Sequence, residues 1–167
     1  MTSKYTTVIG VDPDSDKSGF AVARDKELIS LHNLRIEEVE GFLSTFDVSN
    51  TIVHVEDVTK RTSAFTAIKA TGIKLPKLPN AKVYITKSQL LRALKIAQDV
   101  GRNKAAESNV VRLIKELGFT VVLEEPSKKW KEGSEVNEFK KVTKWSKQSN
   151  PDTRSAAYFA YRGLLCK

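Results

Sequence analysis

Apolar and polar stretches alternate at the start of the chain in the manner of a small β-sheet. Residues 6–11 are rich in β-branched and apolar side chains, and the turn-forming segment DPDSDKSG separates them from a second apolar run at 20–23. A third strand is expected at 27–34, after a polar turn at 24–26. The pattern therefore predicts consecutive strands joined as an antiparallel meander.

Helical spacing of apolar residues and further strand-like runs follow. Nearly continuous apolar runs at 51–55 and 120–123 suit buried strands. Between them, apolar positions three or four residues apart predict a long helix that begins at a cap, Thr86 or Ser88, and ends at Gly118. The remaining predicted elements are helices at 36–46, 59–71, 134–145 and from Pro151 onward, and an exposed connection at 72–81.

The length of the chain indicates how these elements are organised. It has 167 residues, the usual size of one domain and enough to cover both faces of a sheet with helices. No internal repeat or linker divides it, so we expect a single domain at 1–167. No stretch approaches the ~20 apolar residues that span a bilayer, and the N-terminus lacks the apolar region of a signal peptide. The sequence therefore favours a soluble, intracellular protein without a membrane partner.

Charge and cysteine content narrow the possible partners. Lysine and arginine total 28 against 20 acidic residues, which gives a net charge of +8 and a sequence pI of about 9.5. Such a surface favours partners with regular negative charge, such as nucleic acid phosphates, although an anionic membrane surface also fits. The single cysteine, Cys166, excludes an internal disulfide and a cysteine-based zinc site. Any bound metal is therefore expected to have mainly oxygen ligands.

Carboxylates at strand ends are the strongest candidates for chemistry. Asp12 and Glu56 each close an apolar run, and adjacent central strands bring such residues to one edge of an open α/β sheet. Asp152, in the first turn of the last helix, can supply a third carboxylate. Together the three can hold two Mg²⁺ ions about 4 Å apart, which activate water and stabilise the leaving oxygen of a phosphodiester. This set predicts hydrolytic phosphoryl transfer.

Each acidic residue in these segments also has a purely structural interpretation. Asp12 can be a turn residue at a strand end, and Asp152 a carboxylate favoured by the helix dipole. Asp14 and Asp16 are most simply turn formers. Asp57 is expected to be solvated, on the opposite face of its strand from the preceding glutamate. The residues expected to be structural also include the two histidines, His32 and His54.

Four segments resemble, in the same order, motifs of the RuvC-like Holliday junction resolvases. VIGVDPDSDKSGFAVA is similar to their opening hairpin, with an aspartate before proline, and IVHVEDV to their second acidic strand end. VGRNKAAESNVVRLIKELGFTVVLEEPSKKWK is similar to their long helix, next strand and lysine-bearing loop, and NPDTRSAAYFAYRG to their closing helix. The matches cover most of the chain, and their shared order is more specific than any motif alone.

This resemblance implies a fold and an activity. The implied fold is α/β and RNase H-like, a mixed five-stranded sheet with helices on both faces, with Asp12 and Glu56 as metal ligands. The implied activity is that of a Mg²⁺-dependent crossover junction endodeoxyribonuclease, with Mn²⁺ as a substitute, that resolves Holliday junctions or other branched DNA. Paired nicks need two sites, so a homodimer is expected. The looseness of the match favours a phage-type protein, and the cytoplasm of a bacterium or phage-infected host is the expected location.

The closing motif departs from the family pattern. RuvC-like proteins carry an acidic residue or histidine followed three residues later by aspartate and then alanine, whereas here Asp152 is followed by Ser155 and Ala156. A serine hydroxyl brings no charge to Mg²⁺. Either Asp152 supplies the third ligand, or part of the catalytic power has been lost and the chain is a junction-binding protein with a weakened site.

Basic and aromatic residues are candidates for DNA contact. The resemblance implies that a lysine in the loop around Trp130 approaches the scissile phosphate and offsets its developing charge. We assign this role to Lys129, with Lys128 and Lys131 as further DNA contacts, although the sequence does not distinguish the three; a solvated loop anchored by Trp130 is the alternative. Arg61, Lys74 and Lys77 are candidates for contact with DNA phosphates, and the alternative is that they form a solvated basic face. Phe65 is a candidate to wedge against an unstacked base, and the alternative is that it is a core residue.

Two further activities use related sheets. An RNase H acting on RNA–DNA hybrids shares the pair of ions and the attack by water, but the lysine loop and the Asp152 motif favour a resolvase. The hairpin DPDSDKSG also resembles the phosphate-binding turn of actin-like ATPases and sugar kinases, which need two lobes around the nucleotide. One domain of this length has room for only one lobe.

Overall fold

A five-stranded mixed sheet forms the centre of the computed structural model, which describes residues 5–60, 71–73 and 84–165. The strand order is β3-β2-β1-β4-β5. The first three strands pair in antiparallel fashion, whereas β1 pairs with β4, and β4 with β5, in parallel. The strands are β1 (Thr7–Asp12), β2 (Ser18–Arg24), β3 (Glu27–Leu34), β4 (Thr51–Glu56) and β5 (Thr120–Glu124).

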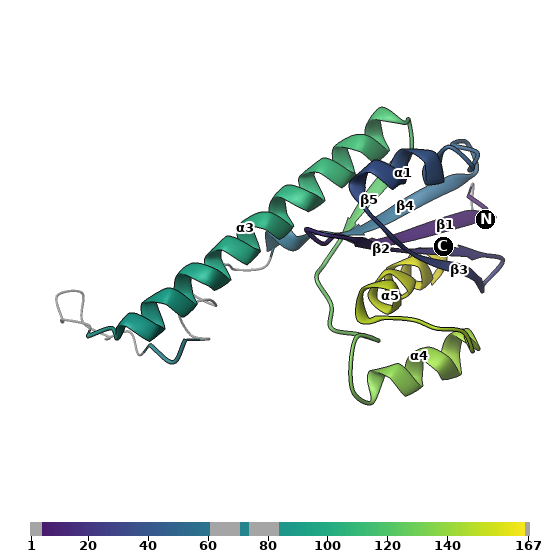
Figure 1. Cartoon of the computed structure of the whole chain (residues 1–167). Helices are drawn as coiled ribbons and strands as arrows, with labels where there is room; N and C mark the ends of the chain where they lie inside the picture. Colours follow the sequence, from purple (N-terminus) through teal and green to yellow (C-terminus); the bar gives the residue numbers. More distant parts are fainter. Residues whose placement is uncertain (1–4, 61–70, 74–83, 166–167) are drawn as a thin grey trace.

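Helices cover both faces of this sheet (Figure 1). α1 (Ile36–Leu43) and α3 (Lys87–Glu116) lie on one face, and α5 (Pro151–Leu165) lies on the other, beside α4 (Glu135–Thr143). One apolar core joins Val11 of β1 to Ile114 of α3, and a second joins Val8 to Ala156 of α5, so side chains alternate between two cores along β1. The predicted fold class is therefore confirmed.

The long helix α3 divides into a packed half and a projecting half. Its N-cap is Thr86, whose hydroxyl accepts a hydrogen bond from the Gln89 N–H while the Gln89 side chain accepts one from the Thr86 N–H at 3.0 Å, so Ser88 is not the cap. Val110 and Ile114 pack against the sheet. No residue from 87 to 106 is buried, and this half extends away from the body (Figure 1).

The segment between β4 and α3 is only partly described. A short 3-10 helix, η1 (Val58–Lys60), follows β4. Most of the helix predicted at 59–71, and all but the first two positions of the connection predicted at 72–81, lie outside the described residues. Within the described part of the chain, no helix combines the length and the apolar character that crossing a membrane requires.

Candidate functional site

Two buried carboxylates end neighbouring strands at the same edge of the sheet. Asp12 is the last residue of β1 and Glu56 the last of β4, and the parallel register pairs Val11 with Val55 immediately before them. Asp12 is 4% exposed and Glu56 is fully buried. Since side chains alternate along a strand and parallel strands share a direction, the two carboxylates lie on the same face of the sheet, the one that α5 covers. The predicted juxtaposition of these residues is present.

Helix α5 brings a third carboxylate to this edge. It begins with a reciprocal cap, in which Asn150 Oδ1 accepts a hydrogen bond from the Thr153 N–H at 2.8 Å and Thr153 Oγ1 accepts one from the Asn150 N–H at 3.0 Å. A Cβ at Gly19 would collide with the backbone of Asp152, so this glycine permits the first turn of α5 to lie directly on β2. β2 residue Gly19 is the register partner of Asp12, and Asp152 is therefore held near it.

The electrostatics of Asp152 reflect this crowding of negative charge. Burial raises the pKa of Asp152, and the Asp12 carboxylate raises it further, with a smaller contribution from Asp14. Lys131 and Arg154 oppose the shift. Asp12, Glu56 and Asp152 thus bring three carboxylates to this edge, and Lys131 is the cation that the described ion pairs place beside the first two.

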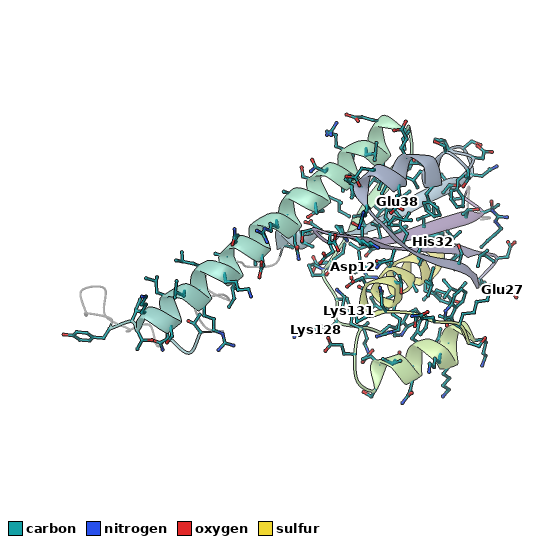
Figure 2. The ribbon with its side chains drawn as sticks, viewed as in Figure 1. Asp12, Glu27, His32, Glu38, Lys128 and Lys131 are labelled. Atoms are coloured by element: carbon teal, nitrogen blue, oxygen red, sulfur yellow. The ribbon has the colours of Figure 1, made fainter. Side chains whose placement is uncertain are left out.

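Lys131 is the cation that reaches these carboxylates. Its Nζ lies 2.6 Å from Asp12 Oδ2 and 3.6 Å from Glu56 Oε2. Figure 2 shows Asp12 and Lys131 at the same end of the sheet, and Lys128 lies farther from Asp12 in this view. A lysine of the loop after β5 thus approaches the site, as the resemblance implies.

The assignment of that role to Lys129 is not supported by the geometry. Lys129 Nζ instead lies 3.2 Å from Glu135 Oε1 and 3.6 Å from Glu138 Oε2 at the surface of α4. The hydrogen bond from Lys129 to Glu135 raises the pKa of the lysine, so these glutamates hold it as a cation away from the carboxylates. Trp130, between the two lysines, is buried with a left-handed φ of 63°, and Lys131 is the one directed to Asp12.

The donor set suits a hard divalent cation. Asp12, Glu56 and Asp152 offer only oxygen ligands, which Mg²⁺ and Mn²⁺ prefer, and the two buried strand-end carboxylates are on rigid elements. Within residues 5–60, 71–73 and 84–165, no three acidic, histidine or cysteine side chains are already gathered in a ready-formed metal cluster. The Lys131 ammonium, which lies between Asp12 and Glu56, neutralises part of their negative charge.

A second network, which the sequence did not indicate, supports the site from β5. Glu124 is the register partner of Glu56, and its Oε1 lies 2.7 Å from Nδ1 of buried His54, while Arg162 of α5 lies 3.4 Å from its other oxygen. This buried contact is in keeping with the structural role expected for His54. The signal available in the sequence was that Glu124, like Glu56, ends an apolar strand.

The expectation of a solvated Asp57 is wrong. Asp57 is 6% exposed, its Oδ1 accepts hydrogen bonds from the N–H and hydroxyl of Thr59, and its own N–H donates to the Glu124 carbonyl at 2.8 Å. Glu107 of α3 is also buried, and the backbone N–H groups of Val58 and Thr59 act to lower its pKa. The reason is that α3 packs over the end of β4 and shields Asp57, which the strand alone would leave exposed to solvent.

The other residues singled out in the sequence lie on α5, in the turn after β1 and in the loop after β5, or outside the described residues. Ser155 is fully buried on α5, directly before Ala156, against whose backbone a Cβ at Gly10 would collide. Asp14 serves as a turn former, because its carboxylate accepts a hydrogen bond from the Asp16 N–H at 3.1 Å. Lys128 is exposed in the loop. The predicted DNA contacts that lie outside the described residues are Arg61, Phe65, Lys74 and Lys77.

Comparison with known proteins identifies the fold. No family model and no curated protein matches the chain. Among solved structures, Thermus thermophilus RuvC in complex with Holliday junction substrate matches with a TM-score of 0.55 at 15% identity, over 94% of this chain and 92% of that one. A second structure of Thermus thermophilus RuvC gives 0.49 at 14% identity, over 93% and 91% of the two chains. The first of these matches shows that the chain has the RNase H-like fold of RuvC.

Proposed function

We propose that this chain is a divalent-metal-dependent endonuclease that hydrolyses phosphodiester bonds in branched DNA, most specifically at Holliday junctions. The observation that carries the proposal is the pair of buried strand-end carboxylates, Asp12 and Glu56, with the Lys131 ammonium between them. The fold match to a RuvC structure that contains a Holliday junction substrate supports the choice of branched DNA. The net charge of +8 favours a polyanionic substrate.

The site residues would divide the chemistry among them. Asp12, Glu56 and Asp152 would hold Mg²⁺ or Mn²⁺. Because each carboxylate has two oxygens, the three residues offer enough ligands for two ions. When bound, such ions activate water and stabilise the leaving oxygen. Burial of the carboxylates keeps them fixed and in a medium where charge interactions are strong. Lys131 would face the scissile phosphate and offset the negative charge that develops on it.

The direct test is cleavage of a four-way DNA junction by the purified chain with Mg²⁺ or Mn²⁺. We expect paired nicks with wild type, and a loss of about 100-fold or more with Asp12→Asn or Glu56→Gln, because each removes a charged ligand while keeping the shape of the side chain. Binding of the junction in a gel-shift assay is expected to persist in both variants. Absence of cleavage by wild type that still binds the junction would contradict the proposal.

Substrate selectivity is tested with matched substrates. Flap DNA, linear duplex and an RNA–DNA hybrid of the same sequence are compared with the four-way junction under the same conditions. We expect the junction to be cut fastest, since a RuvC-like arrangement is suited to branched DNA. Preferential cleavage of the RNA strand of the hybrid would instead indicate an RNase H.

A second candidate function is that of a junction-binding protein with a weakened site. Ser155 favours it, because this fully buried residue replaces the expected aspartate and its Oγ has no hydrogen-bond partner among the described residues. The variant Ser155→Asp separates the candidates. For an active nuclease built around serine, a further buried carboxylate lowers cleavage and destabilises the metal-free protein by about 3 kcal/mol.

The readouts for Ser155→Asp are junction cleavage and thermal unfolding with and without Mg²⁺. Ser155→Ala is the control, and we expect it to be nearly neutral because the hydroxyl makes no hydrogen bond within the described residues. A rise in cleavage of about tenfold or more in Ser155→Asp would favour the weakened-site candidate instead, since the added charge would then restore a missing ligand.

We also propose that the chain acts as a homodimer. The projecting half of α3 carries exposed leucines, with Leu90 50%, Leu91 56% and Leu94 58% exposed. Spacings of three and four residues place them on one side of the helix. A second copy of this chain is the occupant that the function favours, because two sites related by a two-fold axis can nick two strands of one junction.

A further inference from the structure

We propose that Arg154 is a positioning residue that holds the backbone of Trp130 and Lys131, so that the Lys131 ammonium reaches between Asp12 and Glu56. Arg154 is on α5 and is 9% exposed. Its Nε donates a hydrogen bond to the Trp130 carbonyl at 3.0 Å, and its Nη2 donates one to the Lys131 carbonyl at 2.5 Å. Nη1 donates to the Ser149 carbonyl at 3.1 Å.

These contacts use properties that only arginine has. The planar guanidinium carries donors in a fixed fork, and here the fork binds two consecutive carbonyls of an irregular loop. Backbone carbonyls that have no partner within a helix or sheet must find one elsewhere when they are removed from water. Lysine at this position is a single point of charge with a flexible stem, so it can replace the fork only in part.

The loop needs such a clamp because its conformation is unfavourable at one residue. Trp130 has a φ of 63°, the left-handed region that residues other than glycine rarely adopt. Its ring is anchored by edge contacts with Phe139, Tyr158 and Tyr161, with centroids 5.4–5.6 Å apart. Its N–H donates to Glu135 Oε2 at 3.2 Å. Arg154 completes this restraint by holding the carbonyl side of the same residue.

The functional consequence follows from the position of the next residue. Lys131 directly follows the clamped Trp130, and its Nζ lies 2.6 Å from Asp12. Arg154 is two residues after Asp152 on the same helix. α5 therefore delivers Asp152 to the site directly, and places Lys131 there through Arg154.

The test is a double-mutant cycle between Arg154→Gln and Lys131→Ala, measured as kcat and KM for junction cleavage. This arm rests on the proposed nuclease function. We expect Arg154→Gln alone to lower kcat about tenfold with less than about a threefold change in KM, and to lower it less than about twofold further in the Lys131→Ala background. Arg154→Lys is expected to restore part of the loss. Equal losses in both backgrounds would overturn the proposal, because a general structural defect does not depend on Lys131.

A second arm does not need cleavage activity. In metal-free protein labelled with ¹⁵N-lysine, an ion-paired and shielded ammonium gives a side-chain NMR signal, which Lys131→Ala identifies. We expect Arg154→Gln to remove this signal while thermal unfolding shows that the chain remains folded. Arg112→Gln, which changes an arginine paired only with Glu116 on the exposed side of α3 among the described contacts, is the control that keeps the signal. A Lys131 signal unchanged in folded Arg154→Gln would overturn the proposal even if wild type cleaves no junction.

Discussion

Lys129 and Lys131 are two residues apart and have opposite electrostatic surroundings. Lys129 lies at the surface, where Glu135 and Glu138 bind it, whereas Lys131 is mostly enclosed and lies 2.6 Å from Asp12. An enclosed ammonium beside carboxylates can act on a phosphate with little screening by water. A solvated ion pair is worth little, by contrast. Whether a lysine of this loop can act on a phosphate therefore depends on its position in the loop, and not on how many lysines the loop contains.

Removing each lysine in turn tests this difference. We expect Lys131→Ala to lower kcat for junction cleavage about 100-fold, because the group that offsets charge on the phosphate is lost. Lys129→Ala is the matched control and is expected to change kcat less than about threefold, since it removes only exposed ion pairs. Single-turnover cleavage with equal junction binding is the measurement. A larger loss in Lys129→Ala than in Lys131→Ala would return the role to Lys129.

Some residues of the site could be predicted from the sequence and others could not, for physical reasons. Asp12 and Glu56 could be predicted, because alternation along strands and parallel pairing fix which residues meet at a sheet edge. The direction of the Lys131 side chain could not be predicted, because it depends on the left-handed backbone conformation of Trp130. No local sequence pattern indicates that conformation. The clamp of Lys131 by Arg154 joins residues 23 positions apart in sequence, which periodicity does not reveal.

At the scale of elements, the strand and helix pattern was predictable because each amphipathic or apolar run has a period set by the backbone. The burial of Asp57 was not predictable in the same way, because it depends on α3 packing over the end of β4. The buried residue of α3 at this contact is Glu107, and the backbone N–H groups of Val58 and Thr59 act to lower its pKa. This contact joins α3 to the segment that directly follows Glu56.

Glu107 makes the stability of the contact between α3 and the segment after β4 depend on pH. Burial raises the pKa of Glu107, and Asp57 raises it further, while the N–H groups of Val58 and Thr59 and the charge of Lys104 oppose the shift. A carboxyl group with a raised pKa in the folded state binds its proton more tightly there than in the unfolded chain. Its contribution to stability is therefore present below the ordinary value of 4.5 and is lost as the pH rises through the folded pKa.

The variant Glu107→Gln removes this titration. We expect its melting temperature to match wild type near about pH 4 and to exceed it by a few degrees near about pH 8, because glutamine keeps an oxygen for the backbone N–H groups and carries no charge. Thermal unfolding by circular dichroism across this range is the measurement. Glu116→Gln, at an exposed position of the same helix, is the control. A melting-temperature difference that stays constant with pH would contradict the titration of Glu107.

At the scale of the whole molecule, the projecting half of α3 is the feature that the single chain does not explain. Thirty residues form this helix, yet its described buried residues, Glu107, Val110 and Ile114, all lie toward its C-terminal end. The sequence left open whether the apolar stripe covers the sheet or forms a dimer face. The structure shows that the C-terminal half covers the sheet, and the exposed leucines of the other half are consistent with the proposed dimer.

Two acidic substitutions on this stripe, Leu90→Glu and Leu94→Glu together, test the dimer. They bring like charges into the proposed two-fold contact, so we expect the assembled mass to fall from twice the 18.6 kDa chain to one chain in light scattering. The fold should persist, because both side chains are at least half exposed. Paired nicks in one junction should then become single, unlinked nicks, since each monomer carries one site.

Val142→Glu, an exposed aliphatic position on α4, is the control that should leave mass and paired nicking unchanged. A variant that remains dimeric would exclude this stripe as the contact, whereas a wild-type chain that is monomeric with DNA bound would exclude the dimer itself.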